Sequence, residues 1–274
     1  LLIALMLFAG CTDMLTTNIF QSFDAPVTPD VADIREMDTV DLLDVVGDLI
    51  ESDTFYEELD EETKDELILT LADVFLDNSG DTPVEQRQEA AILTVDIVLN
   101  TTDAGDVVGG ITEVLNDLVA AGGIPEGTDP ELFIADLIEQ IFGGVVPIAS
   151  LGVAPKVYIG LEQFTAIIEA IQQAADAHRA FGDLLTDLDG VAGVDVPPGF
   201  NIGQIAQDAV VTIIVSNAID EIGIVPLWEI IFGDGAATLT MVNNPLDDPA
   251  LLNIIEAAGL GDLLAELLTN GGTS

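Results

Sequence analysis

The sequence predicts an all-α protein built as a multi-helix array, and three observations lead to this fold class. Segments with apolar residues at helical spacing follow one another from residue 38 onward, and several follow an Asp or Thr that can cap a helix. Of the 274 residues, 49% are apolar, which is enough for a core and excludes intrinsic disorder. The segment richest in β-branched residues, 203–223, carries polar residues at every fourth position, as a helix does and a strand does not.

Four helices are expected in the front half of the chain, with starts that lie 22 residues apart. Asp38 and Asp60 precede the first two helices. Thr82 is expected to cap the third, with Pro83 at its first position and Glu85 completing a capping box. The expected ranges are 39–52, 61–77, 83–100 and 104–123.

This regular spacing is compatible with two architectures. Two successive helices make a hairpin of about 44 residues, as in a short HEAT-like α-solenoid. An irregular helical bundle explains the spacing equally well, because a typical helix and a short loop together have this length. The position eleven residues into each unit is a leucine, namely Leu49, Leu71, Leu93 and Leu115.

The back half is expected to add further helices after a Gly- and Pro-rich boundary at 122–130. This boundary divides the body into an acidic helical lobe, 38–125, and a more apolar lobe, 126–274. In the helix that starts at Val157, apolar residues as far as His178 form one stripe. The expected helical segments are 131–142, 157–178, 203–223, 226–233, 249–259 after Asp248, and 263–270 after Asp262.

The stretch 140–161 is unusual because Lys156 is its single charged residue. Pro147 and Pro155 prevent one continuous helix there. The stretch is either a buried connector or an apolar patch that faces a membrane or a partner.

The charge excludes some partners and suggests a solvent. Fifty acidic residues face five basic ones, which gives a net charge of −45. Phosphate backbones repel such a polyanion, so we expect no binding to nucleic acid. Scarce Lys with abundant Asp resembles proteins adapted to salt, because dissolved ions screen the self-repulsion. An acidic surface that serves solubility alone is the alternative.

The N-terminus indicates where the protein works. Residues 1–9 form an apolar run too short to span a bilayer, and Ala9 and Gly10 precede the sole cysteine, Cys11. This pattern resembles the lipobox of bacterial lipoproteins. The resemblance implies that residues 1–10 are a signal peptide, that Cys11 is lipidated, and that 11–37 form a tether. A buried N-terminal helix with an ordinary core cysteine is the alternative.

The lipobox resemblance also implies a location. Residue 1 is Leu, with no initiator Met or basic leader, so we expect the signal peptide to be truncated at its start. The residue after Cys11 is Thr12 rather than Asp, which in this family indicates the outer membrane rather than the inner one. We therefore expect an extracytoplasmic, lipid-anchored protein that holds no disulfide, since Cys11 would be acylated.

Catalytic chemistry is not expected from this sequence. His178, the one histidine, lies on an apolar stripe and is predicted to be structural, because a lone His cannot build a typical zinc site. The sequence contains no nucleophile elbow, Walker loop or dinucleotide fingerprint, so we expect neither an enzyme nor a cofactor.

Calcium is the metal most worth checking in so acidic a chain. Asp187 and Asp189 match part of an EF-hand loop, but Leu185 and Val196 stand where that loop needs acidic ligands. The turn 77–81 is a second short acidic loop without a complete motif. These are weak calcium candidates, and we expect no dedicated metal site.

The sequence thus favours a non-enzymatic envelope scaffold or partner-binding module, anchored by Cys11 to the membrane. A periplasmic carrier of an apolar ligand or lipid is the alternative, because helices such as 204–223 could line a cavity. The partner, the ligand and the oligomeric state are not encoded in any recognisable motif.

Overall fold

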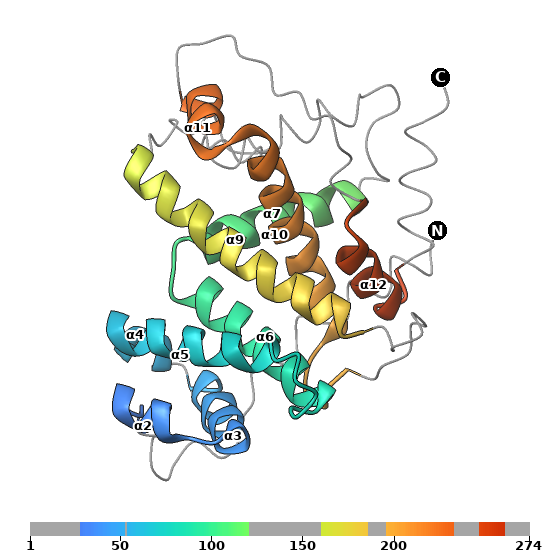
Figure 1. Cartoon of the computed structure of the whole chain (residues 1–274). Helices are drawn as coiled ribbons and strands as arrows, with labels where there is room; N and C mark the ends of the chain where they lie inside the picture. The colour runs from blue at the N-terminus through green and yellow to red at the C-terminus, as the bar shows by residue number, and fades with distance from the viewer. Residues whose placement is uncertain (1–27, 53, 121–159, 186–195, 233–246, 261–274) are drawn as a thin grey trace.

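The computed structural model describes residues 28–52, 54–120, 160–185, 196–232 and 247–260 (Figure 1). Every regular element in these ranges is a helix, which confirms the all-α fold class. The front part contains α2 (Val31–Glu36), α3 (Thr39–Ile50), α4 (Phe55–Glu58), α5 (Glu61–Phe75), α6 (Val84–Asn100) and α7 (Ala104–Ala120). The back part contains α9 (Leu161–Asp183), α10 (Ile202–Ile222), α11 (Ile224–Phe232) and α12 (Pro249–Ala257).

Polar side chains cap several of these helices where the sequence predicts their starts. Asp38 begins α3, Asp60 begins α5 and Asp248 begins α12. Each carboxylate accepts hydrogen bonds from backbone N–H groups of the first turn, which have no partner within the helix. Asn201 caps α10 in the same way, and Gly223 ends that helix with a φ of +88°.

The start of α6 differs from the expected capping box. The helix begins at Val84, and Pro83 is its N-cap residue in an extended conformation, with no side-chain cap. Extended backbone at Pro83 places Thr82 one residue too early to cap, so the box with Glu85 does not form. The N–H of Thr82 instead donates to Oδ2 of Asp77 at 3.3 Å.

The expected tether, 11–37, ends in a helix rather than in irregular chain. Asp30 caps α2, which packs against α5 and buries Ile34 completely. Arg35 adds a bidentate pair with Glu66, with both N···O distances at 2.7 Å. A helix of six residues is too short to show a helical period of apolar residues, so the sequence does not predict α2.

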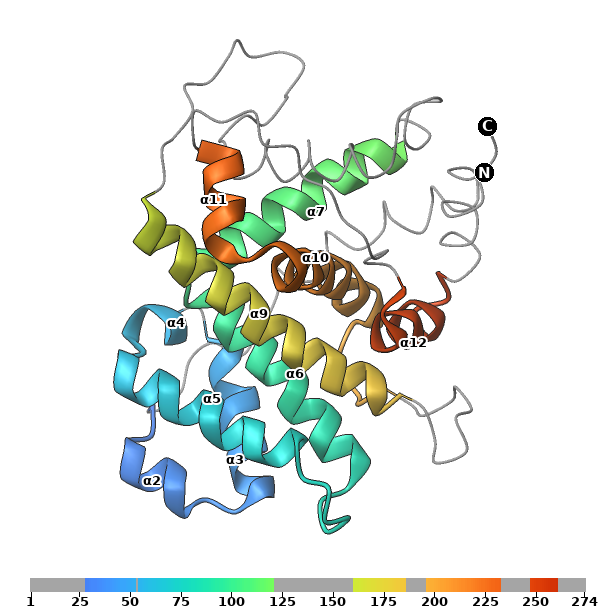
Figure 2. The same ribbon diagram turned by 45° about the horizontal axis from the view of Figure 1, so that its top comes forward.

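Helix α9 is the centre of the array. It packs along α6, which lies between α9 and α5 (Figures 1 and 2). It also contacts α5, α7, α10, α11 and α12. In a solenoid each repeat touches only its neighbours, so this packing favours the irregular helical bundle over the HEAT-like solenoid.

Within the described ranges, one hydrophobic core runs through both expected lobes. Leu71 and Leu93 from the front lobe are fully buried in the same cluster as Ile168 and Ile213 from the back lobe. Leu49 is also buried, whereas the side chain of Leu115 is outside the described set. The boundary at 125/126 therefore does not divide the core.

Among the helices described, α10 alone is long and apolar enough to cross a membrane by length and composition. In the fold, 56% of its most apolar window is buried. A core helix passes the same test, and α10 packs between α7, α9 and α12.

Several predictions fall outside the described ranges and stay predictions. They concern the signal peptide 1–10, Cys11, the helices 131–142 and 263–270, and most of the stretch around Lys156.

Candidate binding groove

A groove with a volume of about 930 Å³ lies between α5 and α9, over α6. Helix α5 and its C-cap residue form one wall, from Glu61 to Leu76. Helix α9 forms the other wall, from Ala166 to Asp183. Between the walls, Thr94 and Val98 of α6, and Thr102 just after that helix, reach the groove.

Short side chains on the walls leave this space open. Helix α5 contributes Ala72, and α9 contributes Ala166, Ala170 and Ala180. The larger apolar residues at the base of the groove, two on α5 and one on α6, are nearly covered by their neighbours and expose little surface. These residues are Ile68 at 7%, Phe75 at 6% and Val98 at 1%.

Carboxylates on both walls make the rim of the groove acidic. Lys64 pairs with Glu61 at 2.6 Å, so this cation of the lining is already engaged on its own helix. Asp65 on α5 and Glu169 on α9 form no ion pair within the described part of the chain. Asp183, at the far end, has its pKa raised by burial and by the nearby charge of Asp248.

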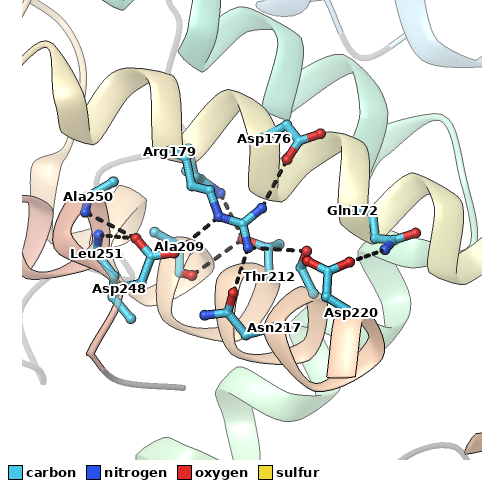
Figure 3. A network of polar contacts seen from close by, with 12 residues as sticks. Gln172, Asp176, Arg179, Ala209, Thr212, Asn217, Asp220, Asp248, Ala250 and Leu251 are labelled. Carbon is cyan, nitrogen blue, oxygen red and sulfur yellow. Dashed lines mark hydrogen bonds and ion pairs between the residues drawn. The ribbon is translucent and has the colours of Figure 1, made fainter. Parts of the chain in front are cut away.

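Arg179, the second cation of the lining, joins three helices at the edge of the groove (Figure 3). Its guanidinium donates to Asp248 on α12 at 3.1 Å, to Asp176 on α9 at 2.9 Å and to Asn217 on α10 at 2.8 Å. Asp248 is the residue that also caps α12 through the N–H of Ala250. The same carboxylate thus starts α12 and fastens it to α9.

Three residues of the polar stripe of α10 contact polar side chains of α9, although Asp220 also remains exposed to solvent. The sequence predicted the stripe but not its partners, of which Gln172 and Arg179 lie outside the apolar stripe of α9 and His178 lies on it. The contacts are Thr212 with His178 at 2.8 Å, Ser216 with Arg179 at 3.3 Å and Asp220 with Gln172 at 3.2 Å.

His178 is buried, as its place on the apolar stripe predicts. It is 2% exposed, and burial lowers the pKa of its imidazole to about 3. The ring is therefore neutral at physiological pH and bonds through Nδ1 to the hydroxyl of Thr212.

Two partly buried carboxyl groups lie away from the groove lining. Asp96 on α6 accepts from the hydroxyl of Tyr56 and from the amide of Asn100. Burial raises its pKa. Burial, together with the charge of Asp96, raises the pKa of Asp208 on α10 to about 6.

The calcium candidates gain no support from the described residues. Asp77 uses its carboxylate to hold its own loop, since Oδ1 accepts from the N–H of Ser79 at 2.8 Å and Oδ2 from that of Thr82. Asp187 and Asp189 lie outside the described ranges. Among the residues that are described, no group of three or more His, Cys, Asp or Glu is placed to hold a metal ion.

Comparisons with protein-family models, with curated proteins and with solved structures found no match to this chain.

Proposed function

We propose that this chain is an exported, lipid-anchored envelope protein whose helical body is a non-enzymatic scaffold, and that the groove between α5 and α9 binds a partner protein. The observation that carries the binding proposal is the groove itself. It has exposed walls, an apolar side chain at its edge in Leu76, which is 59% exposed, and a length of several helical turns. The anchoring proposal is supported by the lipobox-like residues that end at Cys11.

The shape of the groove favours a macromolecular partner over a small molecule. Pockets for small ligands enclose most of the ligand surface. Here the residues high on both walls are exposed, including Asp65, Ala166 and Gln173. A ligand in this groove would keep one side in water along its whole length, as a docked protein segment does.

The packing of α10 favours the scaffold over a carrier of an apolar ligand. A cavity that holds a lipid would leave accessible surface on the residues that line it. Ala209, Ile213 and Ala218 of α10 have no exposed surface at all. The apolar face of this helix is filled by its neighbours α7, α9 and α12.

Metabolic labelling with a clickable fatty acid tests the anchor. The full chain should incorporate the label, and the Cys11→Ser variant should not, because the thioether forms at the cysteine sulfur. Equal labelling of both proteins would refute lipidation at Cys11.

Site-specific photo-crosslinking in intact cells tests the groove. A photoreactive residue at Gln173, on the α9 wall, should yield a discrete crosslinked product. The same residue at Glu256, which is exposed on α12 outside the groove, serves as the control. Equal products from both positions would show that the groove is not the binding surface.

A further inference from the structure

The residues that line the groove indicate the chemistry of the partner it would bind. We infer that the groove between α5 and α9 receives a basic amphipathic α-helix of about four turns from another protein. This inference rests on the proposed partner-binding function and adds the class of partner.

The dimensions match a helix. The α5 wall runs from Glu61 to Leu76, and at 1.5 Å per residue this span is about 22 Å long. The α9 wall, from Ala166 to Asp183, is about 26 Å long. A helix of about 15 residues has the same length. The alanines along α9 allow a third helix to approach closely, since helices pack at interaxial distances set by the side chains between them.

The apolar residues of the groove match the apolar face of such a helix. Ile68 and Phe75 are nearly covered, but Leu76 at the end of the α5 wall is 59% exposed and Ala166 on the α9 wall is exposed. Apolar side chains at positions i, i+3, i+4 and i+7 of a docked helix would cover these surfaces and remove them from water.

The walls select the charge of the occupant. Five carboxylates line the groove, on both of its sides, against two cations. Those cations are engaged, because Lys64 pairs with Glu61 and Arg179 pairs with Asp176 and Asp248. Lys or Arg on the two flanks of a docked helix would therefore meet carboxylates on α5 and α9 at once, which charge complementarity favours.

The same charges disfavour other occupants. A second copy of this chain would bring 50 acidic residues and five basic ones to an acidic rim. Anionic lipid headgroups and nucleic acids would be repelled for the same reason.

Fluorescence anisotropy with labelled peptides tests this inference on the full chain. The probe is a helical peptide of about 15 residues with Leu along one face and Lys on its flanks. Two comparison peptides have Glu in place of Lys, or the same residues in an order that destroys the apolar face. We expect the first peptide to bind, the Glu peptide not to bind, and the reordered peptide to bind at least about tenfold more weakly.

Matched variants locate the site. Asp65→Asn with Glu169→Gln should weaken binding of the Lys peptide about fivefold or more, since two contact ion pairs are lost. Asp41→Asn with Glu256→Gln removes the same charge from exposed positions outside the groove and should change binding less than about twofold. Equal weakening by both pairs would show diffuse attraction to a polyanion and overturn the inference.

The outcome separates the inference from the proposed function. Position-dependent crosslinking at Gln173 in cells, together with equal binding of the Lys and Glu peptides, would leave the groove as a binding surface and reject a basic helix as its partner. Absence of that crosslink would reject the proposed function itself.

Discussion

At the scale of single residues, Arg179 contributes most to the local organisation of the fold. One guanidinium holds α9, α10 and α12 together in a chain that has only five basic residues. Its side chain is 23% exposed and that of Asp248 is 12% exposed, so this ion pair is better shielded from water than a surface pair. Removing this cation also leaves Asp176 and Asp248 without its compensating charge.

Arg179→Gln is therefore expected to lower the free energy of unfolding by about 2–3 kcal/mol. Urea unfolding measures this loss. The control is Arg35→Gln, which breaks a bidentate pair with Glu66 at a side chain that is 63% exposed. The control should cost much less, because water screens an exposed pair. Equal losses of unfolding free energy in the two variants would contradict the stabilising role of the Arg179 contacts.

Asp208 makes stability depend on pH. Its pKa in the folded protein is about 6, above the unfolded value near 4. Between these values the folded state binds more protons than the unfolded state, so the contribution of Asp208 to stability falls as pH rises from about 4 to 6. Above pH 6 the ionised carboxylate of Asp208 lowers the free energy of unfolding by a constant amount, on the order of 2 kcal/mol.

Asp208→Asn should therefore stabilise the protein at pH 7.5 and leave it nearly unchanged at pH 4. Thermal unfolding of both proteins across this pH range measures the difference, which isolates Asp208 from the other carboxylates. A difference that does not change with pH would contradict the raised pKa.

At the scale of elements, α9 and α12 approach each other closely at a glycine. Gly182 on α9 lies against the backbone of Ala250, and a Cβ at this glycine would collide with the carbonyl group of Ala250. The carbonyl of Gly182 also accepts from the amide of Asn253 at 3.1 Å. This contact lies close to the link between Arg179 and Asp248.

Gly182→Ala is expected to destabilise the fold by about 1–3 kcal/mol, because α12 must move away from α9. Denaturant unfolding checks this value. Gly109→Ala is a matched control, since nothing lies within 4 Å of a Cβ at that helical glycine. It should be neutral or stabilising, because Ala favours a helix more than Gly does. An equal loss at both positions would contradict the close packing.

The helix starts show which features the sequence can predict and which it cannot. Asp38, Asp60 and Asp248 start helices as predicted, because capping depends on a few neighbouring residues. Thr82 does not cap α6 as predicted, because Pro83 is extended and occupies the N-cap position. The N–H of Thr82 donates instead to the carboxylate of Asp77, five residues earlier in the chain. The groove could not be predicted, because it depends on which helices pair, and α5 and α9 are far apart along the chain.

At the scale of the whole molecule, charge is the dominant property. A net charge of −45 on 274 residues opposes compaction, and five basic residues cannot neutralise it. Dissolved ions shorten the range of this repulsion, to about 10 Å at 0.1 M salt and about 3 Å at 1 M. We therefore expect the fold to depend on salt.

The melting temperature should rise by several degrees as sodium chloride increases from 0.1 M to 3 M. The rise should be steepest below about 1 M, where screening of the net charge becomes nearly complete. Circular dichroism at 222 nm measures it. A melting temperature that stays constant or falls as the salt concentration rises would contradict the proposed adaptation to salt.

Crosslinking in intact cells, with and without a blocked groove, tests the central claim most directly. Ala166 is exposed in the α9 wall, and Ala166→Trp would fill the groove without disturbing the core. Ala257→Trp places the same ring on an exposed alanine of α12. We predict that Ala166→Trp abolishes the product formed from a photoreactive residue at Gln173, and that Ala257→Trp leaves it intact. An undiminished product with Trp at position 166 would contradict binding of a partner in this groove.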